Sequence, residues 1–437
     1  MNLDSQWGVP TVSMHTRSFG WVVKLVAKQK GMPHHRMVYV PQPVMGQSPA
    51  TLREYVAGLD PLTGQPVMEE IIDGLTRPLN TDEKQKVTWT RSTPRLVEAA
   101  SEDEMHQLFI ESHWTDYLPI VLPTEERVAA MLKGTSHKPD EVVGRMRPTN
   151  HREFWEYTVE KVAVNAVMAG ARPGYFPVIL ALAASGATAR PSTTSSAAAM
   201  AVVNGPIRHE IGMNWGTGAM GPYNHANATI GRAYGLLSTN LQGGSHPGET
   251  YMGSQGNNYA YNSLTFAENE ERSPWEPFHV EHGFRLQDSV VSVFGGCRTT
   301  AFTLGVREKT WEEQVRDMLR GINPYIAPTY VLDPITARLF IDRGLQTKQD
   351  LINWTLKNAK VRAGVYWDHQ LVANYIRPRA DMGEEPYATL LKAAEDELIV
   401  PYRPKDVKVL ITGGETNGYW RIIGAPYHRS VSIDEWR

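Results

Sequence analysis

Hydrophobic positions near the N-terminus switch between the periods of strands and of a helix. Val9–His15 and Met37–Val40 are short runs that predict two strands. Between them, Ser18–Lys30 carries apolar residues three and four positions apart, which predicts a helix that ends at Gly31. This order predicts a parallel βαβ unit with a right-handed crossover. Two strands do not make a stable parallel sheet, so a later segment or another chain must complete it.

The same patterns predict a larger set of elements further along the chain, in the α/β class. An N-terminal incomplete βαβ module, half of a flavodoxin-like sheet, is followed by a larger, loop-rich α+β domain. We place the module at residues 1–80, a helical connector at 81–150 and the large domain, with the candidate site, at 151–437. No internal repeat is evident. Helices are expected at Glu102–Phe109, Thr124–Lys133, Arg152–Gly170 (capped by Asn150), Pro177–Gly186, His225–Leu237, Trp311–Leu319, Leu332–Gly344 and Lys348–Leu356 (capped by Thr347), and strands at Ser196–Val203, Ser289–Phe294 and Val407–Thr412.

The composition narrows the range of partners. The 437 residues carry a formal net charge of −3 at pH 7 without a basic block, so neither nucleic acid nor an anionic membrane is expected as a partner. The most apolar run, Phe176–Ala184, is far shorter than the roughly 20 residues of a membrane-spanning helix. The N-terminus lacks a signal-peptide pattern and one cysteine fits a reducing compartment, so we expect a soluble, cytoplasmic protein. No Walker or Rossmann glycine motif is present, so no bound nucleotide is expected.

The stretch from Val203 to Cys297 combines glycine, asparagine, histidine and glutamate with few lysines. Polar groups set among glycines and aromatic residues are often buried and hydrogen-bonded, and a cluster of them is a reasonable place for a site. The carboxylates of residues 268–271 can raise one another's pKa and suit proton transfer, although a solvated turn is the alternative. We predict catalytic roles for Glu268, Glu270, His279, His209 and Cys297, and substrate binding by Asn204, Arg208, Glu210, Asn214, His225 and Asn227.

Two features of this stretch suggest more specific chemistry, and each has a structural alternative. His279, His282 and His246 could be ligands of a divalent metal such as Zn or Fe, although their spacing matches no strong metal motif. The alternative is that each imidazole is hydrogen-bonded separately in a polar core. Cys297 follows two glycines at a predicted strand end and could act as a nucleophile, with Arg298 favouring the thiolate. Its alternative is a small buried hydrophobic residue.

Four segments of the chain can be compared with a known family: Val159–Gly170, Val203–Arg208, Ala226–Ala233 and Phe266–Pro277. They resemble the large domain found with UGSC-type proteins, a family named for a Sec/Cys-Gly-Ser-Cys motif, and a weaker likeness extends toward Gly413–Gly414. Val9–Pro43 also resembles the strand, helix and strand that follow the motif in the small UGSC domain. The motif itself is absent, because the only cysteine lies far downstream.

The resemblance and the incomplete sheet together suggest an obligate heteromer. We expect a subunit of a soluble enzyme, a hydrolase or lyase that acts on a small organic molecule, with a second subunit bearing a Cys or Sec motif. A thiol-dependent oxidoreductase subunit is an alternative, but it requires a resolving cysteine that this chain cannot provide alone. A further alternative is a non-catalytic scaffold or binding subunit for a UGSC-type partner.

Overall fold

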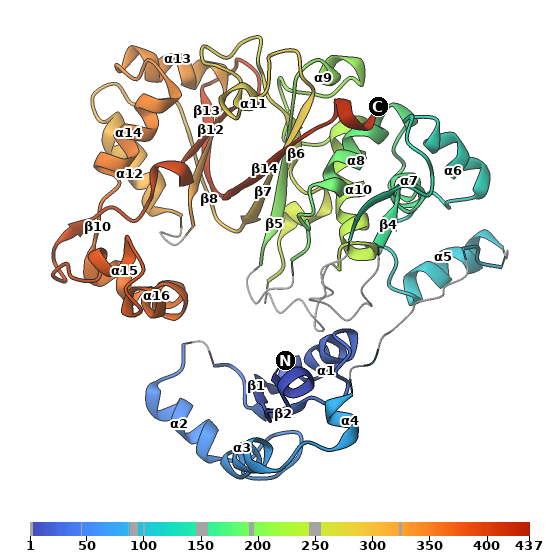
Figure 1. Ribbon diagram of the computed structural model, residues 1–437. Helices are drawn as coiled ribbons and strands as arrows, with labels where there is room; N and C mark the ends of the chain where they lie inside the picture. The colour runs from blue at the N-terminus through green and yellow to red at the C-terminus, as the bar shows by residue number, and fades with distance from the viewer. Residues whose placement is uncertain are drawn as a thin grey trace.

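The computed structural model describes residues 3–44, 46–85, 87, 95–98, 101–145, 156–191, 196–243, 255–322 and 326–437. The N-terminal module lies apart from the central sheets (Figure 1). In it, β1 (Val12–Thr16) and β2 (Arg36–Val40) pair in parallel and α1 (Gly20–Gln29) connects them, so the predicted βαβ unit is confirmed. No other described strand joins this sheet. Two further helices, α2 (Pro49–Ala57) and α3 (Val67–Thr76), complete the module.

The segment between the module and the sheets contains α4 (Thr81–Lys84), α5 (Glu102–Glu111) and α6 (Glu125–Leu132). A short antiparallel pair follows, made of β3 (Val142–Arg145) and β4 (Glu156–Thr158). For the helix predicted at Arg152–Gly170, residues 152–155 lie outside the described residues, residues 156–158 pair with β3, and the helix α7 begins at Val159. Its predicted cap, Asn150, lies outside the described residues.

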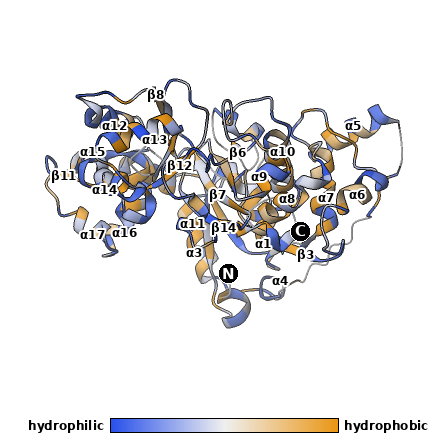
Figure 2. Ribbon diagram, turned by 90° about the horizontal axis from the view of Figure 1, so that it is seen from above, coloured by the Kyte–Doolittle hydropathy of each residue, from blue (hydrophilic) through white to orange (hydrophobic). Residues whose placement is uncertain are grey.

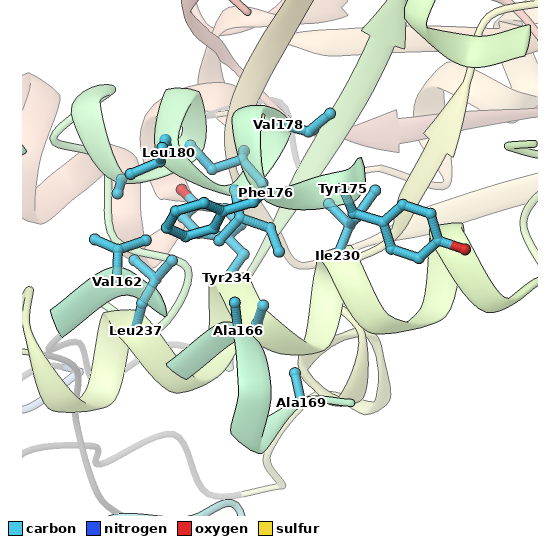
Figure 3. Packing of buried hydrophobic residues seen from close by; sticks show 14 of the residues in the cluster. Val162, Ala166, Ala169, Tyr175, Phe176, Val178, Leu180, Ile230, Tyr234 and Leu237 are labelled. Atoms are coloured by element: carbon cyan, nitrogen blue, oxygen red, sulfur yellow. The ribbon is translucent and has the colours of Figure 1, made fainter. Parts of the chain in front are cut away.

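The first of two four-stranded sheets contains, in order, β14 (Tyr427–Ser432), β7 (Val290–Cys297), β5 (Ala198–Asn204) and β6 (Thr265–Ala267). One face is covered by α8 (Phe176–Ala184) and α10 (His225–Asn240), and α7 (Val159–Met168) packs against both helices. Every residue of α8 is apolar (Figure 2), as expected for a helix surrounded by packing partners. In the core of this half, Val162 of α7 and Leu237 of α10 lie side by side next to the ring of Phe176 of α8 (Figure 3).

The second sheet contains, in order, β12 (Lys408–Ile411), β9 (Pro328–Leu332), β13 (Tyr419–Gly424) and β8 (Thr300–Leu304). It is covered by α12 (Trp311–Arg320), α13 (Pro334–Asp342) and α14 (Lys348–Asn358). The predicted helix Leu332–Gly344 starts too early, because Leu332 belongs to β9 and Asp333 caps α13. The predicted cap Thr347 is confirmed and forms a capping box with Asp350.

A helical segment follows α14 and has a small core of its own. The segment consists of β10 (Val361–Arg362), α15 (Ala363–Asp368), α16 (Arg377–Asp381), α17 (Tyr387–Leu390) and β11 (Leu398–Ile399).

None of the helices in the described part of the chain is both long and apolar enough to cross a membrane.

The two sheets repeat one another, although no repeat is evident in the sequence. Strands β5, β6, β7 and β8 of the first half correspond to β9, β12, β13 and β14 of the second. In each half the first two strands are parallel, and the third pairs antiparallel with the first. The registers agree as well: Val202 lies opposite Phe266 and Ser292, and Val331 lies opposite Leu410 and Arg421.

The halves exchange their last strands. β7 and β8 follow each other closely, as do β13 and β14, and residues 290–304 pair antiparallel with residues 419–432 through both sheets. Thus β14 of the second half completes the first sheet, and β8 of the first half completes the second. Helices cover the outer faces, and the inner faces share a core in which Phe294 of the first sheet joins Val331 of the second.

Candidate functional site at the carboxyl ends of the parallel strands

The asparagine and glutamates of the polar stretch meet at one edge of the first sheet. Because β5 and β6 are parallel neighbours, Asn204 and residues 268–271 leave the sheet at the same edge. Nδ2 of Asn204 donates to Oε2 of Glu268 at 2.7 Å and to Oε1 of Glu270 at 2.9 Å. We define the polar cluster as Asn204, Arg208, His209, Glu268, Glu270 and Glu271.

Glu268 is the buried centre of the polar cluster, with no exposed surface. Its Oε2 also accepts the backbone N–H of Phe278 at 2.7 Å. Its Oε1 accepts the N–H of Ile411 at 3.2 Å, and Nζ of Lys348 lies 3.5 Å away. Since Ile411 ends β12, this carboxylate ties the two halves together. Its burial and these hydrogen bonds give Glu268 the position of a structural anchor, and the catalytic role predicted for it stays a prediction.

Arg208 holds the other two carboxylates from α9 (Ile207–Glu210). Its side chain is 3% exposed, and its NH2 lies 3.0 Å from Glu270 and 2.9 Å from Glu271. Burial alone would raise the pKa of Glu271, but the hydrogen bonds from Arg208 and His209 keep it below its ordinary value. Nε2 of His209 lies 2.7 Å from Glu271, and the His209 side chain is 51% exposed. His209 and Glu271 are thus the part of the cluster that a ligand can reach.

The other predicted binding residues have separate surroundings. Glu210 pairs with the C-terminal arginine. The side chain of Asn227 accepts the N–H of Asn214 and donates to its carbonyl, which fixes the loop before α10. His225 starts α10 beside a tyrosine hydroxyl, where burial lowers its pKa. The polar cluster contains none of these four residues.

The two predicted metal ligands near α11 (Phe278–Glu281) lie close to backbone carbonyls. Nδ1 of His282 is 2.8 Å from the carbonyl oxygen of Phe278, and Nε2 of the buried His279 is 3.4 Å from that of Leu286. The described residues hold no group of three or more His, Cys, Asp or Glu arranged for a metal. The third predicted ligand, His246, lies outside those residues, so a metal site stays a prediction.

A second cluster of titratable side chains surrounds α11, and it contains two lysines that were not predicted from the sequence. Nζ of Lys348 lies 3.2 Å from Glu281, and Nζ of Lys408 lies 3.2 Å from Nε2 of His282. Burial raises the pKa of Glu281 to about 7 and lowers the pKa of both His282 and Lys408. In all three side chains the pKa moves in the direction that favours the neutral form, as expected when ionisable groups are removed from water.

Cys297 is poorly placed to act as a nucleophile. Its side chain has no exposed surface and belongs to the core between the sheets. Burial raises the pKa of its thiol to about 12, and the nearby charge of Arg298 does not offset this effect. The thiol is therefore protonated at neutral pH and out of reach of a substrate. The structure agrees with the alternative of a small buried hydrophobic residue.

A pocket of about 360 Å³, the Arg421 pocket, opens at the carboxyl ends of β9 and β12. Val331 and Arg421 line it from the second sheet, and residues 217–221, 412–414, 416 and 417 line it from two glycine-containing loops. The carbonyl of Trp215 accepts the N–H of Gly413 at 2.9 Å, and the Trp215 ring packs against His209. Trp215 thus joins the pocket to the polar cluster. The glycines of the second loop were recognised from the sequence, but Arg421 was not predicted as a site residue.

The N-terminal module is the part of the chain that resembles a known protein family. Residues 4–63 match the model of the UGSC family, so this segment is related to UGSC proteins. The matched segment contains no cysteine. No curated protein and no solved structure matches the chain. The match does not reach residues 159–277, so the resemblance of that part to the large UGSC-associated domain stays a prediction.

Proposed function

We propose that this chain is a subunit of an enzyme, a hydrolase or lyase, that acts on a small organic molecule where the Arg421 pocket adjoins the polar cluster. The position of the pocket carries this proposal. It lies beyond the carboxyl ends of parallel strands, where α/β proteins commonly bind ligands. Its volume is near the lower end for small-molecule sites, which favours a small substrate.

His209 and Glu271 are the residues that we assign to proton transfer. When Nε2 of His209 carries the proton and donates to Glu271, Nδ1 keeps a free lone pair that can accept a proton. Glu271 then stabilises the imidazolium that forms. Arg208 favours the ionised form of Glu271, because its guanidinium donates hydrogen bonds to that carboxylate.

In this proposal the reactive thiol belongs to a partner subunit. Cys297 is buried and protonated, and the UGSC-related segment has no cysteine. That segment also contains a parallel sheet of only two described strands. A partner that bears a Cys or Sec motif and adds strands beside β1 or β2 would supply both missing parts. A divalent metal is the alternative means of activating a substrate or a water molecule.

A thiol-dependent oxidoreductase subunit is the second candidate. The relation of residues 4–63 to the UGSC family favours it, because the family is named for a thiol or selenol motif. In that case the partner would have to carry both the attacking and the resolving group, since this chain has one buried cysteine.

The proposal is tested on the native assembly. Its subunits are identified by mass spectrometry, and the compounds that it consumes are found by incubating it with a metabolite extract of its source. We expect a second, Cys- or Sec-bearing polypeptide, and consumption of a small organic compound that His209→Gln slows at least tenfold. His137→Gln is the matched control, because His137 forms a similar pair with Glu141 outside the polar cluster.

Two results would contradict the proposal. Full activity in a preparation with one polypeptide would show that no partner subunit is needed. An assembled His209→Gln complex that is as active as the wild type would show that this chain is a scaffold.

A further inference from the structure

Arg421 is the one cationic side chain among the described residues that line the pocket. It lies on β13 opposite Val331, and its guanidinium carbon is 5.6 Å from the ring centroid of Tyr419. No carboxylate in the described part of the chain forms an ion pair with it. Because arginine stays protonated in proteins, the pocket contains a permanent positive charge without a fixed counter-ion.

The carboxylates near this cation are already engaged. Asp333 caps α13 and accepts two backbone N–H groups, one of them that of Tyr419 at 2.5 Å. Glu415 is held by Arg338 and Arg272. One available cation close to the carboxylate of Asp333 favours a ligand with a single negative charge, because a dianion would leave unbalanced negative charge in the pocket.

The loop from Thr412 to Asn417 adds neutral hydrogen-bond donors. The backbone N–H groups of Gly414 and Thr416 have no acceptor within the described residues. A Cβ on Gly414 would clash with Oγ1 and Cα of Thr217, so the two loops of the pocket meet without room for a side chain. The loops therefore present backbone groups to a ligand at close range.

One side of the pocket is apolar and exposed to solvent. Leu304 lines it and is 59% exposed. Phe302 pairs with Arg421 across the strands, stacks on Tyr419 and is 64% exposed. Exposed apolar residues gathered beside a pocket indicate a ligand with an apolar body.

The duplicated first half shows how this pocket differs from its counterpart. The position equivalent to Arg421 is Ser292, whose hydroxyl lies 2.7 Å from that of Ser430. The connection from β6 to β7 carries Phe278, which packs against Phe294 in the core between the sheets. The much shorter connection from β12 to β13 brings no such side chain, so the second half keeps an open space and a cation.

We propose that the Arg421 pocket binds a small organic monocarboxylate with an apolar body. The carboxylate lies on the guanidinium of Arg421, and the apolar part lies against Leu304 and Tyr419. This assignment deepens the proposed function by naming its substrate class and rests on it, whereas its test measures binding without turnover.

The test is isothermal titration calorimetry on the full chain with butanoate, hexanoate, octanoate and 3-phenylpropanoate. We expect at least one acid to bind, and its uncharged amide to bind at least tenfold more weakly. Arg421→Met is expected to weaken binding of the acid about 10- to 100-fold, because a charge-assisted hydrogen bond is lost. Arg421→Lys keeps the charge but loses the planar fork, so its affinity falls between the two. Arg320→Met, on the exposed part of α12, is the matched control and should bind as the wild type does.

The inference is overturned if no acid in the series binds, or if the amide binds as tightly as the acid. It is also overturned if Arg421→Met, or Arg421→Lys should the first variant not fold, binds both ligands like the wild type. Displacement of the acid by an equal concentration of inorganic phosphate would show a general anion site instead of a carboxylate site. None of these results depends on the activity of the His209→Gln complex, so the two proposals fail separately.

Discussion

Replacing Glu268 by Gln tests how strongly one buried carboxylate holds the two halves together. The wild-type side chain has four donors around it, from Asn204, Phe278, Ile411 and Lys348. Gln has almost the same shape, but one oxygen becomes an amide nitrogen. In either orientation of the amide, the donors that were hydrogen-bonded to one carboxylate oxygen face an NH2 group and lose their acceptor.

The expected cost follows from these contacts. A hydrogen bond to a charged group contributes about 1.5–3 kcal/mol, and two of them face the new amide nitrogen. Lys348, which is buried, also loses one of its two carboxylate partners. Some relaxation offsets the loss, so we expect Glu268→Gln to lower the free energy of unfolding by about 3–5 kcal/mol.

The assay is urea denaturation at pH 7.5, followed by tryptophan fluorescence and compared through midpoints and slopes. Glu276→Gln is the matched control, because Glu276 lies on the same connection but is exposed, and it should change stability by less than about 0.5 kcal/mol. A Glu268→Gln midpoint equal to that of the control would refute the anchoring role. Combined with lost activity, that result would support the proton-transfer role predicted from the sequence.

Three further predictions concern the groups around the core and the pocket. Because burial raises the pKa of Glu281 from 4.5 to about 7, its contribution to stability is full below pH 4.5 and is lost as the pH rises to about 7. Glu281→Gln should remove this part of the decline in urea midpoint between pH 4.5 and 8, and an unchanged slope would contradict the assignment. Cys297 should react with a thiol reagent such as DTNB at least 100-fold more slowly in native protein than in urea, whereas fast native labelling would show an accessible thiol. Gly414→Ala should weaken binding of the carboxylate at least tenfold by separating the two loops, while Gly174→Ala, where a Cβ meets open space, should not.

The sequence allowed prediction of elements whose signals are local. The N-terminal βαβ unit follows from apolar spacing and Gly31, and the strand that ends at Asn204 follows from a small apolar run before a turn. The cap at Thr347 is equally local. The helix expected at Leu332 began too early because Leu332 is apolar and fits either period, and the pairing of β9 with β12 and β13 decided between them.

The duplication and the pocket could not be predicted in the same way. The two halves share strand order and register, which depend on pairing between residues far apart in the chain. Arg421 stands in a strand of otherwise apolar and aromatic residues, a signal that becomes informative only once its lack of an ion-pair partner is known. Cys297 looked accessible because it follows two glycines, but the strand continues past them into the core between the sheets.

The exchange of β8 and β14 has a consequence for how the large part of the chain is assembled. A cut between Leu304 and Pro328 would give two fragments, each lacking one strand of its own sheet and carrying the strand that the other needs. This is the arrangement of a strand-swapped dimer whose two subunits have been joined end to end. Its association therefore does not depend on protein concentration. One copy is also free to keep a packed interior while the other opens a binding site at Arg421.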